Sequence, residues 1–381
     1  MSNKFSSPSL SVLRAAPQYV PLTDICQPKQ WKTIPKAELK TKGYPVYGAN
    51  GLIGYSDEYN HENKTILIAC RGASCGAINV CLPKSYVTGN AMCLDNLNEE
   101  FDLDFLQHYL QTYDFKKAIS GSAQPQITRS GLSLIMIPIL PVSLQRKISC
   151  ILSAVDENKK QAEQTVKHLD SLIKSRFVEM FGEAEKPRKD FPVKALNDVC
   201  SSIVRGPFGS AMKKEFFVPQ GANTYKVYEQ KHAIQKRADI GAYYITRDRF
   251  ETLKRFECFP GDILMSCSGT MGEFYQLPPS CEPGVMNQAL CKFTLSEAIL
   301  SDYFLGFMEQ VVDELGAKGS GIKNVSSVKY IKAIRIPLPP LELQRQFADF
   351  VTQVDKLRFE AQQQIEKLET LKKSLMQEYF G

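Results

Sequence analysis

The hydrophobic pattern of the chain alternates between two kinds of segment. Two stretches, 138–182 and 337–381, carry apolar residues at spacings of three and four, which is typical of long amphipathic helices. The regions between them, 17–137 and 183–336, consist of short strand-like apolar runs broken by glycine-rich turns, with a few helical runs. The pattern therefore predicts two α/β regions and two long helices.

The apolar residues of each long stretch fit a heptad, which favours a coiled-coil seam. Asn158, Thr165 and Gln364 fall at d positions, where polar layers would fix register. Prolines at the start of each stretch set the helix entry, and about 38 residues give a helix of about 57 Å. The apolar positions predicted for these interface helices are Leu144, Ile148, Ile151, Val155, Leu169, Leu172, Leu343, Phe347, Phe350, Val354, Leu368 and Leu371.

The two long stretches are copies of each other. Residues 138–182 recur at 337–381 without a gap, and 16 of the 45 positions are identical. A generic dimerisation or bundle helix is the plainer interpretation of a single heptad segment. Two matched copies in one chain favour an intramolecular antiparallel pair, related by a pseudo-two-fold axis.

The repeat continues into the α/β regions. The segment RGASCG (71–76) matches SGTMG (268–272), GNAMCL (89–94) aligns with MNQALC (286–291), and GSAQPQIT (121–128) aligns with GSGIKNVS (319–326). The α/β regions are thus predicted to be diverged copies of one fold. The predicted order is an N-terminal segment (1–16), a first domain (17–140), a central helix (141–182), a second domain (183–339) and a C-terminal helix (340–381).

Composition narrows the class of protein. A net charge of +6 without a polybasic tail means that any nucleic-acid surface must focus charge locally. No apolar run reaches the roughly 18 residues of a membrane span and no secretory leader is visible, so we expect a cytoplasmic protein. The 11 cysteines form no CxxC pair and the four histidines lie away from them, so we expect reduced thiols and no metal site.

Catalytic motifs are missing from the sequence. It contains no P-loop, no glycine-rich dinucleotide fingerprint, no HExxH, and no Asn-Pro-Pro-aromatic or Asp-Pro-Pro-aromatic methyltransferase motif. None of the four histidines neighbours a candidate nucleophile. We therefore expect no catalytic residue in this chain.

The glycine-rich turns carry side chains suited to nucleic acid. Asn and Gln pair with adenine, Arg and Lys with guanine, and Ser, Thr and Lys reach phosphates. The alternative is that these segments only form turns and do not contact DNA. The predicted DNA-binding residues are Tyr47, Asn50, Tyr55, Arg71, Ser74, Gln124, Gln126, Thr128, Arg205, Phe208, Ser210, Lys213, Lys214, Ser268, Thr270, Lys323, Asn324 and Ser326.

Several segments of the chain follow one another in the order of a known family. They are YPVYGANGLIGY, CRGASCGAINV, GNAM, GSAQPQIT, GPFGSAMKKEFF, GSGIKNV and the two LQR helices ending in Phe-Gly. In this order they resemble the specificity subunit of type I restriction–modification systems. The resemblance covers residues 17–381. It implies an α+β chain with two target-recognition domains, separated by two long helices that form an antiparallel coiled coil. Each domain would read one half of an interrupted, asymmetric DNA target.

The resemblance also implies partners. The helices would space the two domains and dock two methylation (M) subunits, which transfer methyl from S-adenosylmethionine to adenine. Motor-nuclease (R) subunits would join and use ATP and Mg, while this chain would bind no cofactor. The alternative is a coiled-coil adaptor that binds proteins and has no DNA specificity.

Overall fold

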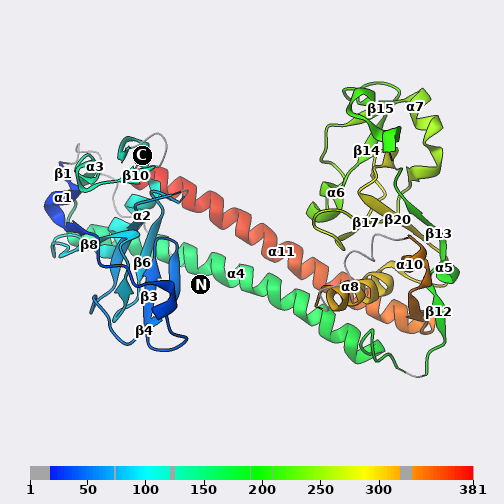
Figure 1. Cartoon of the computed structure of the whole chain (residues 1–381), viewed down its shortest axis with the longest axis horizontal. Helices are drawn as coiled ribbons and strands as arrows, with labels where there is room; N and C mark the ends of the chain where they lie inside the picture. The colour runs from blue at the N-terminus through cyan, green and yellow to red at the C-terminus, as the bar shows by residue number, and fades with distance from the viewer. Residues whose placement is uncertain are drawn as a thin grey trace, which may run out of the picture. The chain divides into compact units, whose positions relative to one another are not determined.

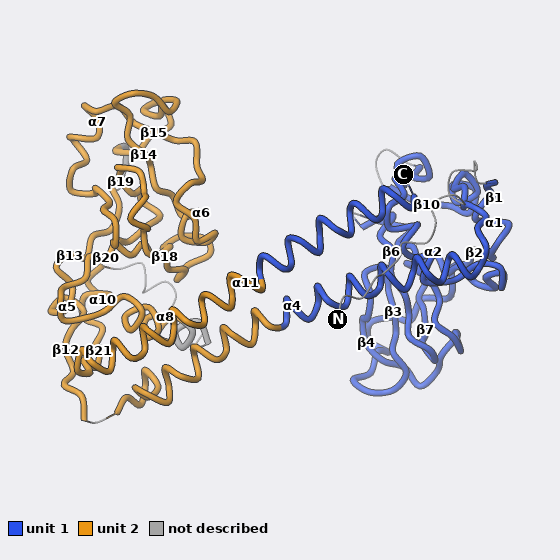
Figure 2. The backbone as a smooth tube through the Cα atoms, turned by 180° about the vertical axis from the view of Figure 1, so that it is seen from behind, with its two compact units in different colours: residues 1–164, 362–381 blue, residues 165–361 orange. Residues whose placement is uncertain are grey.

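The structure is a computed structural model that describes residues 18–72, 74–120, 125–188, 190–207, 209–317 and 328–380. The chain divides into two compact units (Figure 2). One contains residues 1–164 and 362–381, and the other contains residues 165–361. Each unit therefore combines one α/β domain with part of both long helices. None of the helices in the described part of the chain is long and apolar enough to cross a membrane.

The first unit contains a four-stranded sheet, a three-stranded sheet and two pairs of short strands (Figure 1). The antiparallel sheet has the order β2 (Gln27–Lys29), β8 (Ala91–Asp95), β5 (Thr65–Ala69), β6 (Ile78–Cys81), and the mixed sheet has the order β4 (Gly51–Ser56), β3 (Tyr44–Gly48), β7 (Tyr86–Val87). The other elements are β1 (Tyr19–Pro21) paired with β11 (Met136–Pro138), β9 (Ile119–Ser120) paired with β10 (Gln126–Ile127), and helices α1 (Leu22–Ile25), α2 (Leu103–Thr112) and α3 (Arg129–Leu132).

The second unit repeats this order with additions. Its antiparallel sheet is β13 (Cys200–Arg205), β20 (Leu290–Leu295), β17 (Ile263–Ser266), β18 (Phe274–Gln276), and its mixed sheet is β15 (Tyr244–Thr246), β14 (Thr224–Tyr228), β19 (Gly284–Met286), β16 (Glu257–Cys258). The other elements are β12 (Val193–Ala195) paired with β21 (Arg335–Pro337), and helices α5 (Leu196–Val199), α6 (Gln230–Gln235), α7 (Arg247–Thr252), α8 (Ser301–Ala317) and α10 (Val328–Ala333). The predicted duplication of one α/β fold is confirmed.

The loop alignment behind that prediction is right in one place and wrong in another. Gly72 and Gly76 match Gly269 and Gly272, and all four have positive φ, which favours glycine at the two ends of this loop. In the next segment, however, the Cys70 N–H donates to Asn90 O, whereas the Cys267 N–H donates to Ala289 O. Strand pairing therefore shifts the alignment of GNAMCL with MNQALC by two residues, because the shared asparagine misled the sequence comparison.

The two long helices are α4 (Val142–Phe181) and α11 (Leu341–Phe380). In the first unit Lys159 Nζ lies 2.7 Å from Glu369 Oε1, and in the second unit Arg358 NH2 lies 2.6 Å from Asp170 Oδ1. Lys159 and Arg358 occupy equivalent positions of the repeat, as do Asp170 and Glu369. Because the partners run in opposite directions in both units, the predicted antiparallel pairing is confirmed.

The heptad pattern predicts correctly only one of the two rows of residues that face the partner helix. Seven of the eight a residues are buried, including Ile148, Val155, Phe347 and Val354, and Leu368 is half-buried. The d positions Asn158, Thr165, Leu172, Leu357, Gln364 and Leu371 are exposed, and Leu144, Ile151, Leu343 and Phe350 are only half-buried. The row four residues after each a position contains no exposed residue, since Leu152 and Ile365 are buried and Lys159, Val166, Ile173, Val351, Arg358 and Lys372 are half-buried, so this row completes the seam. The polar d residues therefore do not fix the register.

A buried glutamine fastens each long helix to its own domain. Gln145 Oε1 accepts from the Asp102 N–H at 2.8 Å, and its Nε2 donates to Glu100 O and Leu140 O. Gln344 makes the same three bonds with Leu300 N–H, Ala298 O and Pro339 O. Both side chains are fully buried. The LQR of each repeat thus lies in the first turns of a helix, and its buried glutamine also bonds three backbone groups of the adjoining domain and helix start.

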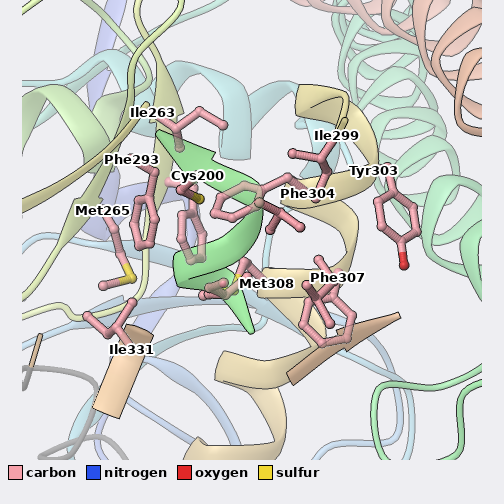
Figure 3. Close-up of a cluster of buried hydrophobic side chains, with 14 of the residues drawn as sticks. Cys200, Ile263, Met265, Phe293, Ile299, Tyr303, Phe304, Phe307, Met308 and Ile331 are labelled. Carbon is pink, nitrogen blue, oxygen red and sulfur yellow. The ribbon is translucent and has the colours of Figure 1, made fainter. Parts of the chain in front are cut away.

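The core of the second unit lies between the antiparallel sheet, α8 and the long helices (Figure 3). Phe177 of α4 stacks on Tyr303 of α8, with ring centroids 5.5 Å apart, and meets Phe347 of α11 edge-on. A Cβ on Gly306 would lie 2.5 Å from the Phe177 ring, so the glycine permits this close approach. In the first unit the main core lies within the α/β domain, and Phe105 of α2 packs on Ile148 and Leu152 of α4 in a smaller separate cluster.

Candidate nucleic-acid interface

Four segments of the first unit meet at one end of its antiparallel sheet. Gln30, just after β2, donates from Nε2 to Gly89 O at 2.9 Å, which ties it to the turn before β8. The loop after β5 pairs with β10 through an isolated bridge between Arg71 and Gln126. The Ile127 N–H also donates to Cys70 O at 3.1 Å. These links fix the backbone from which the polar loop side chains project.

A pocket of about 260 Å³ lies at this junction. Three predicted DNA-binding residues, Arg71, Gln126 and Thr128, line it together, as do Gln30 and Arg129. The lining contains two arginines and no carboxylate, so it is electropositive. Arginine with a glutamine and a hydroxyl is the donor and acceptor set that reads base edges and holds phosphates.

The side chains of this pocket differ in how firmly they are held. The Thr128 hydroxyl accepts from the Gly131 N–H at 3.1 Å and bonds the Ser130 hydroxyl, so it is fixed as the cap of α3. Arg71 is exposed and Gln126 is half-buried. Arg71 and Gln126 are therefore better placed than Thr128 to change partners when a ligand arrives.

The equivalent junction of the second unit is held by Arg205. Its Nε donates to Gln288 O at 3.2 Å and its NH2 donates to Cys267 O at 3.3 Å. Gln30 bonds the equivalent residues of the first unit, because its Nε2 reaches Gly89 O and Cys70 Sγ. Arg205 and Gln30 are thus structural counterparts that join the same two loops. The structure gives Arg205 this positioning role, and its contact with DNA stays a prediction.

Ser268 and Thr270 are exposed on the loop that Arg205 holds. Thr270 O accepts from the Ser266 hydroxyl at 2.7 Å and from Gln230 Nε2 at 3.1 Å. The loop backbone is therefore held by one hydrogen bond from β17 and one from α6. The backbone that carries both hydroxyl side chains is therefore fixed, and their contact with DNA stays a prediction.

The other predicted residues lie apart from these junctions. Tyr47 of β3 packs half-buried against the cluster around Leu67 and Val87, and Tyr55 of β4 is half-buried in the same hairpin, whose turn exposes Asn50. Ser74 is half-buried in its turn, and Lys213 and Lys214 are exposed, with Lys213 3.5 Å from Glu215. Gln124, Phe208, Lys323, Asn324, Ser326 and the side chain of Ser210 lie outside the described part of the chain.

Sequence reasoning missed Gln30 and Arg129 as members of the first junction. Gln30 stands in QPKQW, where no turn or motif marks it, and its role depends on a bond to Gly89 that is 59 residues away. Arg129 directly follows the PQIT segment and could have been included by extending that motif by one residue.

Two α/β domains of one topology, each with polar loops at an end of its antiparallel sheet, together with paired helices, define an internally duplicated recognition protein. The chain belongs to the family described as "Type I restriction modification DNA specificity domain", which matches residues 17–168 and 188–370. Each α/β domain thus carries one match.

Individual relatives agree with this assignment. The chain is 25% identical over 332 residues to the Haemophilus influenzae protein named type I restriction enzyme specificity subunit S.HindORF215P, covering 84% of this chain and 83% of that one. It is 22% identical over 282 residues to the MjaX specificity subunit of Methanocaldococcus jannaschii, covering 72% and 65%. The type I S subunit of M. genitalium has the same fold, with a TM-score of 0.62 at 16% identity over 97% of this chain and 98% of that chain.

Proposed function

We propose that this chain supplies the DNA specificity of a type I restriction–modification enzyme and contributes no catalytic group of its own. Each α/β domain reads one half of a bipartite target. The observation that carries the proposal is the duplication itself. The same frame presents Arg71 and Gln126 beside Gln30 in one copy, and Ser268 and Thr270 beside Arg205 in the other. Two different loop sets on one frame suit an asymmetric target.

The outer face of the long helices supports a docking role. Leu172 and Leu371 occupy equivalent positions of the repeat and are 47% and 46% exposed, and Leu357, on the same heptad row, is 52% exposed. These side chains leave apolar surface in water, which is typical of an interaction site. We assign this face to two methylation subunits, with the motor-nuclease subunits joining the assembly in the cytoplasm. S-adenosylmethionine, ATP and Mg are then bound by the partners.

The competing function is a coiled-coil adaptor that binds only proteins. The two are separated by titrating random duplex DNA with the complex of this chain and its methylation subunit at several salt concentrations. A DNA reader loses affinity steeply as salt rises, because phosphate contacts release counterions. If the complex shows no salt-dependent DNA affinity, the adaptor function replaces the DNA-reading function.

A single side chain tests the first reading surface. Gln126→Ala removes an amide that lines the junction pocket but leaves the β10 backbone intact, so we expect a changed methylation site and a folded chain. Gln18→Ala is the matched control, since Gln18 is exposed and lies outside that pocket. Single-base methylome sequencing of cells carrying each variant gives the result. An unchanged target in the Gln126→Ala strain removes Gln126 from the reading surface.

A further inference from the structure

Three side chains with metal-binding chemistry meet in the first unit, away from the junction pocket. Cys93 and Asp95 are two residues apart on β8, so they share one face of the strand. His61 precedes β5 and is held by paired backbone bonds with Ser85, at 3.0 and 3.1 Å. One ligand atom from each of His61, Cys93 and Asp95 lies within 4.8 Å of the other two. These residues are called the β8 cluster.

We propose that the β8 cluster binds a zinc ion through His61 Nε2, Cys93 Sγ and Asp95 Oδ1, with water as the fourth ligand. Nitrogen, thiolate sulfur and carboxylate oxygen are the donors that zinc takes in proteins. A tetrahedral ion sets such donors about 3.3–3.6 Å apart. His61 Nε2 and Asp95 Oδ1 are 2.9 Å apart, so small rotations of these side chains bring the donors into place.

The tautomer of His61 is fixed by its neighbour. The Val87 N–H donates to Asn60 Oδ1 at 2.8 Å and Asn60 Nδ2 donates to Val87 O at 3.0 Å, so the orientation of the Asn60 amide is set. Its Oδ1 lies 2.6 Å from His61 Nδ1, which must therefore carry the proton and donate. The other ring nitrogen, Nε2, faces Asp95 Oδ1, where it either donates a second proton or offers its lone pair to a metal ion. A metal-bound histidine has this arrangement, with its second nitrogen donating to an oxygen.

Asp95 is oriented in the same way. Its Oδ2 accepts from Trp31 Nε1 at 3.0 Å, which leaves Oδ1 facing His61 Nε2. A carboxylate oxygen and a nitrogen lone pair repel unless a cation lies between them. That cation is either a proton on His61 or a metal ion, and the third member of the cluster favours the metal.

The third member is the thiol of Cys93, which is fully buried. Among the described residues it has no hydrogen-bond partner, whereas the thiols of Cys26 and Cys70 in the same unit donate to backbone carbonyls. A bound zinc ion would displace the thiol proton and give the sulfur a partner.

The second unit holds a cation at the equivalent place. Strand pairing aligns Cys93 with Lys292 and Asp95 with Thr294. The Lys292 ammonium is buried, lies 3.0 Å from Asp262 Oδ2, and donates to Glu257 O at 2.6 Å. Thr294 also donates to Asp262. One copy of the fold thus neutralises this site with a side-chain cation, while the other copy presents three donors for an ion.

Entry is open from solvent. A pocket of about 570 Å³ reaches His61 and Asp95 and is also lined by Gln27, Lys29 and Trp31. It supplies the route for the ion and room for the water ligand. Because His61 bridges to the mixed sheet through Ser85 while Cys93 and Asp95 belong to the antiparallel sheet, the ion would fasten the two sheets together.

The test uses the full chain, stripped with a chelator and titrated with Zn²⁺ against a chromophoric competitor. We expect one Zn²⁺ per chain in the natural sequence and in Cys26→Ser, a matched change of a buried thiol outside the cluster. Cys93→Ser and His61→Gln should each weaken binding at least about 100-fold, since each removes a direct ligand. Substitution by Co²⁺ should give a thiolate-to-metal absorption band that Cys93→Ser abolishes.

Two results would overturn the proposal. One is a natural chain that takes up no stoichiometric Zn²⁺, in which case the β8 cluster is a His61–Asp95 ion pair only. The other is binding that Cys93→Ser and His61→Gln leave unchanged, which would place the ion elsewhere. Circular dichroism of each stripped variant checks folding, and Asp95→Asn, which keeps the shape of the side chain, provides a third variant if either of the others is unfolded.

Discussion

The two copies of the α/β domain keep the same backbone links but make some of them with different side chains. Gln145 and Gln344 fasten the helices with identical sets of three hydrogen bonds. Gln30 and Arg205 are chemically unlike, yet both hold the same pair of loops. In both copies the same backbone groups need hydrogen-bond partners, which constrains the backbone of the domain. The side chains that supply those bonds, and the side chains that the loops expose, can differ between the copies.

The largest expected difference between the copies concerns the helix seam. Phe347 and Ile148 are equivalent and both fully buried, but Phe347 also meets the rings of Phe177 and Phe181 at 5.4 and 5.6 Å. We expect Phe347→Ala to lower the free energy of unfolding by about 4 kcal/mol and Ile148→Ala by about 3 kcal/mol. Chemical denaturation combined with hydrogen exchange assigns each loss to its unit. A larger loss for Ile148→Ala would contradict the unequal packing of the two copies.

The two buried glutamines that bond each long helix to its domain should contribute equally to stability. Gln145→Ala and Gln344→Ala each remove three hydrogen bonds made by a fully buried side chain, so we expect each to lower the free energy of unfolding by about 2–4 kcal/mol. Lys147→Ala and Gln346→Ala are the controls, because both residues are exposed and lie two positions further along the same helices. Thermal unfolding compares all four variants. If only one glutamine matters, the two copies are fastened differently.

The side chains that join the two loops in each copy, Gln30 and Arg205, should have a smaller effect on stability. Arg205→Ala and Gln30→Ala should each lower the free energy of unfolding by about 1–2 kcal/mol, because hydrogen bonds that join the two loops are lost. Arg205→Gln should retain part of that stability, since a glutamine makes the equivalent bonds in the first copy. Unfolding measurements on the three variants decide this. An Arg205→Gln chain as unstable as Arg205→Ala would show that the holders are not interchangeable.

The outer helix face should affect stability least. Leu172→Asn and Leu371→Asn change equivalent, half-exposed side chains, so each should alter the free energy of unfolding by less than about 0.5 kcal/mol. Each should nevertheless weaken capture of the methylation subunit, measured by calorimetry or gel filtration. Normal capture by both variants would move the docking surface to another face.

Much of this architecture is readable from the sequence because it depends on local or repeated patterns. The 45-residue repeat identifies two helices and their antiparallel pairing, and the ordered glycine-rich segments identify the family. The loop glycines are recognisable because positive φ restricts the choice of residue. Arg71, Gln126 and Thr128 were predicted from residue type alone, and the structure brings them to one pocket.

The rest depended on contacts between residues that are distant in the sequence. Apolar residues occur on the a, d and e rows of the repeat, so periodicity alone could not choose which two rows face the partner helix. Packing chose Leu152 and Val351 over Leu172 and Leu371. The pairing of strands likewise equates Gln30 with Arg205 and sets Cys93 and Asp95 beside His61, at a spacing that no metal motif describes. The sequence determined the repeat, the elements and the family, whereas tertiary packing decided which faces are buried and which distant side chains meet.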